Sequence, residues 1–297
     1  MAEQARTYQY FKDTNFEKGF IIGGEEGRTS LTFGKHLAEE PFWMMGENDT
    51  RFPIYTAPLI INGDGSMEYR NEAKCVKLFD TGFGTAVQMD CYGDVEFDHI
   101  RQDGEAWPHL LLGHDFCGSE LIPLREFSSL IYQHDVVINQ SENRMGDDLV
   151  RDAHVTQTTF YITLVNHTEG SLGYGDFIWF GVPVFDHRHV FPDAFHLLDV
   201  GGKHDATGKI IYVLGGEDFL KNNYGGVNPR DGKWAHCEVD VLKYVQQALD
   251  CAQSEGHMQN TKVEDLTIGH CNFGWEVTGG LRASMAIRNM SLLGTYK

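Results

Sequence analysis

One strand-like segment, Val155–Asn166, carries the side chains with the most chemical potential. Two sets of residues alternate along it. The first set is Gln157, Thr159, Tyr161 and Thr163, and the second set is Thr158, Phe160, Ile162 and Leu164. Alternate side chains share a face of a strand, so the first set is predicted to line one face and the second to enter the core. A tyrosine on such a face can take a proton α to a carboxylate, while a glutamine steadies the developing charge. The same row also suits a solvent-facing strand or a surface that binds sugar hydroxyls.

Histidine side chains supply further candidate acids and bases. Of the fourteen in the chain, His134 is the candidate that joins the polar row from another strand. It shares a face of the segment Leu130–Asn139 with apolar residues, which is typical of a core side chain. If His134 is structural, we expect His109 or His114 to replace it.

Aromatic residues beside glycines and acids form the second half of a candidate sugar site. The candidate substrate-binding residues are Trp107, Trp179, Asp176, Trp275 and Glu276. Exposed rings stack on sugar C–H faces, and adjacent polar groups hold the hydroxyls. Aromatic residues on sandwich strands also fill the core between the sheets, so both placements stay open.

A short acidic and histidine-rich segment is the candidate metal site. Asp186, His187 and His189 lie within four residues, and carboxylates and imidazoles are common metal ligands. The same spacing suits a histidine oriented by a carboxylate. The sequence assigns no third, distant ligand and contains no motif that fixes a cofactor.

Short runs rich in β-branched and aromatic residues must position these side chains. The predicted strands are Lys74–Phe79, Ala86–Tyr92, His109–His114, Leu130–Asn139, Val155–Asn166, Phe177–Phe185, Lys209–Leu214, Leu266–Cys271 and Leu281–Leu293. One helix is predicted, over residues 240–255, from an apolar stripe at helical spacing. Asp240 is its expected N-cap and Gly256 its expected stop.

These elements predict the fold class. One amphipathic helix among many strands, without strand–helix alternation, indicates an all-β protein, an antiparallel β-sandwich of jelly-roll or concanavalin-like type with long loops. No linker or repeat divides the chain, so residues 1–297 are predicted to form a single sandwich domain decorated by the helix near 240–255.

The end of the chain resembles a known group of proteins. Gly274–Val277 followed by Met285–Leu292 is similar to the closing strands of carbohydrate-associated jelly rolls, namely carbohydrate-binding modules and sandwich lyases of the alginate and glucuronan lyase type. In such lyases Gln, His and Tyr on a concave sheet neutralise a uronate and move its C5 proton. The resemblance implies these roles for Gln157, His134 and Tyr161, and it implies calcium as a structural metal ion.

Composition excludes some partners. The chain has 297 residues, with 43 acidic against 24 basic side chains and a formal charge of −19 at pH 7. Such a charge repels phosphate backbones, so neither nucleic acid nor an anionic membrane is an expected partner. The N-terminus does not resemble a leader and the cysteines are scattered, which favours a cytoplasmic location. A secreted protein whose leader has been removed would show the same pattern.

The sequence therefore predicts a protein that recognises an oligo- or polysaccharide on a concave sheet. As an enzyme it would be a polysaccharide lyase or a glycoside hydrolase. A non-catalytic carbohydrate-binding module or lectin, and a structural sandwich without a small-ligand site, are the alternatives. The sugar and the oligomeric state are not predicted.

Overall fold

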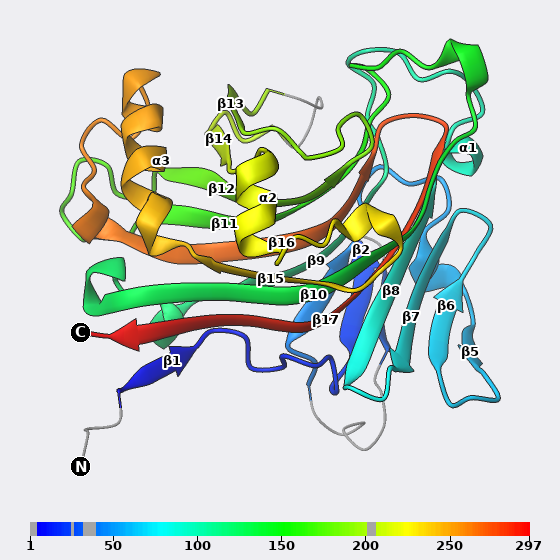
Figure 1. The fold of residues 1–297 in the computed structure, drawn as a ribbon, viewed down its shortest axis with the longest axis horizontal. Helices are drawn as coiled ribbons and strands as arrows, with labels where there is room; N and C mark the ends of the chain where they lie inside the picture. Colours follow the sequence, from blue (N-terminus) through cyan, green and yellow to red (C-terminus); the bar gives the residue numbers. More distant parts are fainter. Residues whose placement is uncertain (1–4, 25–26, 32–39, 201–205) are drawn as a thin grey trace.

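A computed structural model describes residues 5–24, 27–31, 40–200 and 206–297. Within these residues the chain forms two large β-sheets that pack against each other (Figure 1). A single cluster of buried apolar side chains fills the space between them. The predicted all-β sandwich is therefore confirmed.

The eight-stranded sheet is built around the two longest strands. Its order is β15 (Ala235–Asp240), β10 (Phe127–Asn143), β17 (Leu281–Tyr296), β8 (Thr85–Tyr92), β7 (Lys74–Asp80), β6 (Met67–Arg70) and β5 (Leu59–Ile61), and β1 (Thr7–Gln9) also pairs with β17. All of its pairings are antiparallel.

The nine-stranded sheet contains the segment with the predicted polar face near its centre. Its order is β13 (Phe195–Leu198), β14 (Ile210–Val213), β12 (Phe177–Asp186), β11 (Thr156–Asn166), β16 (Leu266–Val277), β9 (His109–Asp115), β4 (Trp43–Gly46), β2 (Phe20–Gly24) and β3 (Gly27–Leu31). Two pairs, β12 with β14 and β2 with β4, are parallel, so the predicted antiparallel pairing holds for most of the sheet but not for all of it.

Alternation along β11 orients both of its faces. Phe160, Ile162 and Leu164 are buried in the core, as the spacing predicts. The ring of Phe160 stacks on Tyr132 of β10, with centroids 3.7 Å apart and planes 8° from parallel. This contact joins the two sheets and leaves the intervening residues of β11 on the outer face.

The predicted long helix is α3 (Leu242–Ser254), which packs on β12 and β14 (Figure 1). Its apolar stripe is buried: Val245, Ala248, Leu249 and Ala252. Gly256, just beyond the helix, has φ +87°, which a glycine adopts without strain. The expected N-cap was wrong, because the Asp240 carboxylate accepts the Leu130 backbone N–H at 3.0 Å instead.

The other helices are short. They are α1 (Gly93–Glu96), α2 (Glu217–Asn223) and the 3₁₀ turns Ile54–Thr56, Gly118–Glu120, Leu124–Glu126, Gly146–Asp148, Pro229–Asp231 and Val263–Asp265. Among the described residues, no helix has the length and apolar character needed to cross a membrane. All six cysteines are free thiols.

Candidate functional site

Four neighbouring strands of the nine-stranded sheet bring polar side chains into one row. Strand register places Gln157 of β11 between Asp186 of β12 and Glu276 of β16. Glu276 in turn lies opposite His109 of β9. Trp275, next to Glu276, is buried in the core, so the row points away from the eight-stranded sheet.

A hydrogen-bonded amide and carboxylate lie at the centre of this row. Gln157 Nε2 donates to Glu276 Oε2 at 2.5 Å, and both side chains are half-buried. Adjacent strands are about 4.8 Å apart, so His109 and Asp186 are the next groups on either side. The structure thus brings together Gln157, Glu276 and His109, which the sequence had named separately.

Asp186 belongs to the row but is held by an arginine. Arg188 donates from Nε at 3.0 Å and from Nη2 at 2.6 Å to the two carboxylate oxygens. Burial raises the pKa of Asp186, but the hydrogen bonds and charge of Arg188 outweigh that effect and bring it below its usual value. Asp186 is therefore ionised, and the guanidinium of Arg188 balances its negative charge at this end of the row.

Aromatic rings gather farther along the same face. Trp179 lies edge-to-face with Tyr161 at a centroid distance of 6.2 Å and with Phe177 at 5.7 Å. The flanking residues Ile178 and Phe180 are buried in the core, so Trp179 points outward. The Trp179 indole, half-buried, forms an apolar platform on the same face as the polar row, opposite Thr163 and six residues along β11 from Gln157.

Tyr161 joins the platform to the row. The Tyr161 ring lies over Gly181 of β12. A Cβ atom at Gly181 would lie 2.8 Å from Tyr161 Cε1, so the ring fits there because glycine has no side chain. Burial raises the pKa of the Tyr161 phenol far above its usual range, and the negative charge of Glu276 raises it further. Tyr161 is therefore protonated at neutral pH and available as a hydrogen-bond donor.

Three residues of this face escaped the sequence analysis. His270 Nδ1 lies 2.6 Å from Asp115 Oδ1, and the His270 ring lies 5.8 Å from Trp179. The hydrogen bond from His270 is the main reason that the pKa of Asp115 lies below its usual value. Asn272 is the register partner of Tyr161. The predicted strand ended at residue 271, whereas continued alternation to residue 277 would have placed His270 and Asn272 on the same face as Glu276. Asp115 lies on β9, one residue beyond the predicted strand His109–His114.

Trp107 closes the other end of the row. Its ring centroid is 5.4 Å from that of His109, and the Arg101 guanidinium carbon lies 5.1 Å from the indole centroid. Trp107 is half-buried and His109 is 7% exposed. Of the candidate aromatic residues, Trp107 thus lies beside the polar row, and Trp179 lies farther along the same face.

Three candidate residues lie elsewhere. His134 is fully buried between the sheets, so the alternative that it is structural is correct. His114 has the strand parity of the core-facing side chains of β9 and stacks on Phe42 with centroids 3.8 Å apart. Trp275 is also fully buried and donates its indole N–H to the Met89 carbonyl at 2.9 Å. None of these groups reaches the outer face.

The burial of His134 predicts an acid sensitivity. Burial lowers its pKa to about 3, whereas the same group in an unfolded chain titrates near 6.5. Between these values the unfolded chain binds more protons than the folded chain, so the free energy of unfolding falls as the pH drops. His134→Phe is expected to flatten this fall in urea titrations from about pH 7 to about pH 4. The exposed control His196→Phe should retain it, and equal slopes in both variants would contradict the assignment.

Asp176 and the candidate metal ligands have structural partners. Asp176 accepts the Lys209 ammonium at 2.6 Å and the Met258 backbone N–H at 3.1 Å, which ties the start of β12 to the loop after α3. His189 Nδ1 lies 3.1 Å from Asp193, and His187 Nδ1 accepts a backbone N–H. Nowhere in the described part of the chain do three or more His, Cys, Asp or Glu side chains converge as metal ligands. Asp186, His187 and His189 thus have protein partners in the structure, and a metal ion held by them stays a prediction.

Comparisons with known proteins found similarity to solved structures. No protein-family model matches the sequence, and the search of curated proteins found no relative. A xyloglucanase domain of a type three effector from Sinorhizobium fredii, solved with cellobiose, is 11% identical, with 81% of this chain and 98% of that chain covered and a TM-score of 0.38. A family 12 xyloglucanase from Bacillus licheniformis is 9% identical, with 85% and 100% covered and a TM-score of 0.40. The function proposed below is argued from the site and not from these similarities.

Proposed function

We propose that the outer face of the nine-stranded sheet binds a neutral carbohydrate chain. The observation that carries this proposal is that the half-buried rings of Trp179 and Tyr161 share the outer face with the hydrogen-bonded Gln157 and Glu276. The rings offer apolar faces to sugar C–H groups, and the amide and carboxylate offer donors and acceptors to hydroxyls. A carbohydrate site needs an apolar surface with a small number of polar groups beside it.

The length of the face favours an oligosaccharide over a single sugar. Gln157 and Tyr161 lie on one strand four residues apart, which corresponds to about 13 Å. Two residues along a strand span roughly one sugar ring, so this stretch alone accommodates about two rings. Trp107 beside His109 extends the face across the sheet.

The charge of the face favours neutral sugars over uronates. Glu276 and Asp115 both place carboxylates on it, and Arg188, the cation in the row, is already paired with Asp186. A polyanion would meet like charge here, and juxtaposed like charges disfavour binding. The face therefore supports a binding protein or a hydrolase for neutral glycans better than a uronate lyase.

Hydrolysis is the second candidate function, favoured by the two carboxylates of the row. Asp186 and Glu276 lie on strands separated only by β11, so their backbones are about 10 Å apart. Inverting glycosidases keep their two carboxyl groups about 6.5–9.5 Å apart. In that reading Glu276 is the acid, and Asp186, kept ionised by Arg188, is the base.

An array of neutral and uronate polysaccharides, scored for retention and for new chain ends, tests both functions. We expect retention on one or more neutral polysaccharides. New reducing ends would show that the protein also hydrolyses the polysaccharide, whereas retention without new ends would show binding alone. Retention on uronate polymers alone, or on none, would contradict the proposal.

A pair of substitutions separates binding from turnover. If the site is hydrolytic, Glu276→Gln removes the carboxyl group that would donate the proton but keeps the shape of the side chain, and turnover is expected to fall by about two orders of magnitude or more while retention persists. Tyr161→Phe removes only a hydroxyl and should weaken retention modestly in either case. Unchanged retention in both Tyr161→Phe and Gln157→Ala would show that the ligand binds elsewhere.

A further inference from the structure

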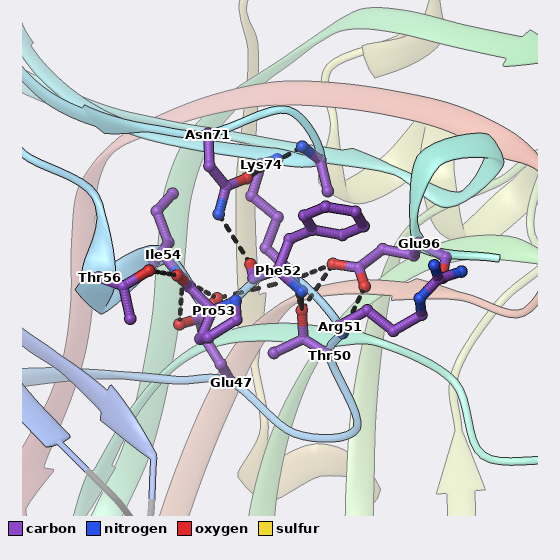
Figure 2. Close-up of polar contacts among 11 residues, drawn as sticks. Glu47, Thr50, Arg51, Phe52, Pro53, Ile54, Thr56, Asn71, Lys74 and Glu96 are labelled. Atoms are coloured by element: carbon purple, nitrogen blue, oxygen red, sulfur yellow. Dashed lines mark hydrogen bonds and ion pairs between the residues drawn. The ribbon is translucent and has the colours of Figure 1, made fainter. Parts of the chain in front are cut away.

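A buried cluster of ionisable groups lies at one end of the sandwich, apart from the outer face of the nine-stranded sheet. Lys74 begins β7, Glu96 ends α1 and Glu47 follows β4. The Lys74 side chain is 0% exposed, and those of Glu47 and Glu96 are each 1% exposed. Figure 2 shows how the three side chains and the segment from Thr50 to Thr56 meet. Solvent does not reach these groups, so the cluster is not a ligand site.

The Glu96 carboxyl is surrounded by donors. Lys74 Nζ contacts Glu96 Oε1 directly, and Thr50 Oγ1 donates to the same oxygen at 2.6 Å. The backbone N–H of Arg51 donates to Oε2 at 2.8 Å. Donors on both oxygens polarise a carboxyl group and stabilise the charge that develops when an amine attacks its carbon.

Glu47 is the second acid of the cluster. Its Oε1 lies 3.7 Å from Lys74 Nζ, and both of its oxygens accept the Ile54 backbone N–H, at 3.0 and 2.8 Å. Burial raises the pKa of Glu47, and the charge of Lys74 lowers it less. Glu47 is therefore placed and tuned to carry a proton next to the amine.

We propose that Lys74 Nζ and the Glu96 side-chain carboxyl join in an intramolecular amide bond, with Glu47 moving the protons. Glu47 passes a proton to the Glu96 carboxylate and takes one from the Lys74 ammonium. The free amine then attacks Glu96 Cδ, a C–N bond forms, and Glu47 relays the second amine proton to the departing hydroxyl. One water molecule leaves, Glu47 ends as it began, and no oxidant or reductant is needed.

The surroundings favour this condensation. Two buried charges carry a desolvation penalty that their attraction offsets only in part, and the amide removes both charges. The reacting groups are held in contact by the fold, which replaces an encounter in solution by a local step. The bond links residues 22 apart and so ties β7 to α1 across the β7–β8 hairpin. Such a cross-link restricts the unfolded chain and stabilises the fold.

Intact mass spectrometry of the denatured full chain tests the proposal. We expect a mass lower than that of the linear sequence by one water molecule, after allowance for N-terminal processing. Tryptic mapping should show no cleavage after Lys74 and a branched peptide that joins the segments around Lys74 and Glu96. A full linear mass with ordinary cleavage at Lys74 would overturn the proposal.

Two variants make the assignment specific. Lys74→Arg keeps the positive charge but lacks the amine, so its full linear mass is expected. Glu47→Gln keeps Lys74 and Glu96 but removes the proton carrier, and most of this variant is expected at full linear mass. Loss of water in Lys74→Arg would place the reaction elsewhere and overturn the proposal, and undiminished loss in Glu47→Gln would overturn the role of Glu47.

Discussion

Replacing Phe160 with alanine is expected to lower the free energy of unfolding by about 3–5 kcal/mol. Phe160 is 1% exposed and stacks on Tyr132 across the two sheets at 3.7 Å. Truncation removes this contact and leaves a cavity at the centre of a close-packed core, which relaxes only in part. Urea denaturation of the wild-type and variant chains measures the difference.

Thr159→Ala is the matched control, because it changes the neighbouring residue of β11 on the outer face. Thr159 is half-buried and its hydroxyl hydrogen-bonds the Tyr161 side chain, so the substitution removes one hydrogen bond and is expected to cost about 1 kcal/mol or less. A loss below about 1 kcal/mol for Phe160→Ala, or equal losses for the two variants, would contradict the assignment of β11 to one buried and one exposed face.

Replacing Trp179 with alanine is expected to weaken carbohydrate binding about thirtyfold, or roughly 2 kcal/mol, the effect of removing an aromatic anchor. Trp179 is half-buried and makes edge-to-face contacts with both Tyr161 and Phe177, so its removal takes away the centre of the aromatic platform. Isothermal titration with an oligosaccharide of the retained neutral polysaccharide measures the change.

Trp234→Ala is the control for this prediction. Trp234 is also half-buried, but it packs against Arg288 on the eight-stranded sheet, with the guanidinium carbon 4.4 Å from the ring centroid. Binding by Trp234→Ala should equal that of the wild type. Unimpaired binding by Trp179→Ala, or a comparable loss in both variants, would remove Trp179 from the site.

Local patterns predicted the central strands and the helix. The alternation around Phe160 indicated which side chains of β11 enter the core, and the apolar stripe located α3. Both patterns arise because one face of the strand or helix is buried, and the resulting spacing of apolar residues can be recognised within a short stretch of sequence. Short strands such as β4 and β5 lack enough residues to show a period, and their pairing depends on distant partners, so they escaped prediction.

The site was only partly predictable, because strand register assembles it. Gln157 and Glu276 are 119 residues apart, and nothing local indicates that they share a hydrogen bond. Residue type identified both of them, but it equally suggested His134 and Trp275, which the sandwich buries. Asp186 illustrates the same limit: its spacing suggested a metal ligand, whereas Arg188, between the candidate ligands, neutralises it.

Indole N–H signals in a ¹⁵N-labelled protein test the central claim most directly, because they locate the bound ligand. During titration with an oligosaccharide of the retained neutral polysaccharide, the Trp179 signal should shift and saturate. The signals of Trp43 and Trp275, which are buried and hydrogen-bonded to backbone carbonyls, should stay in place. A saturating titration that leaves Trp179 unmoved while Trp234 shifts would place the ligand on the eight-stranded sheet and contradict the account.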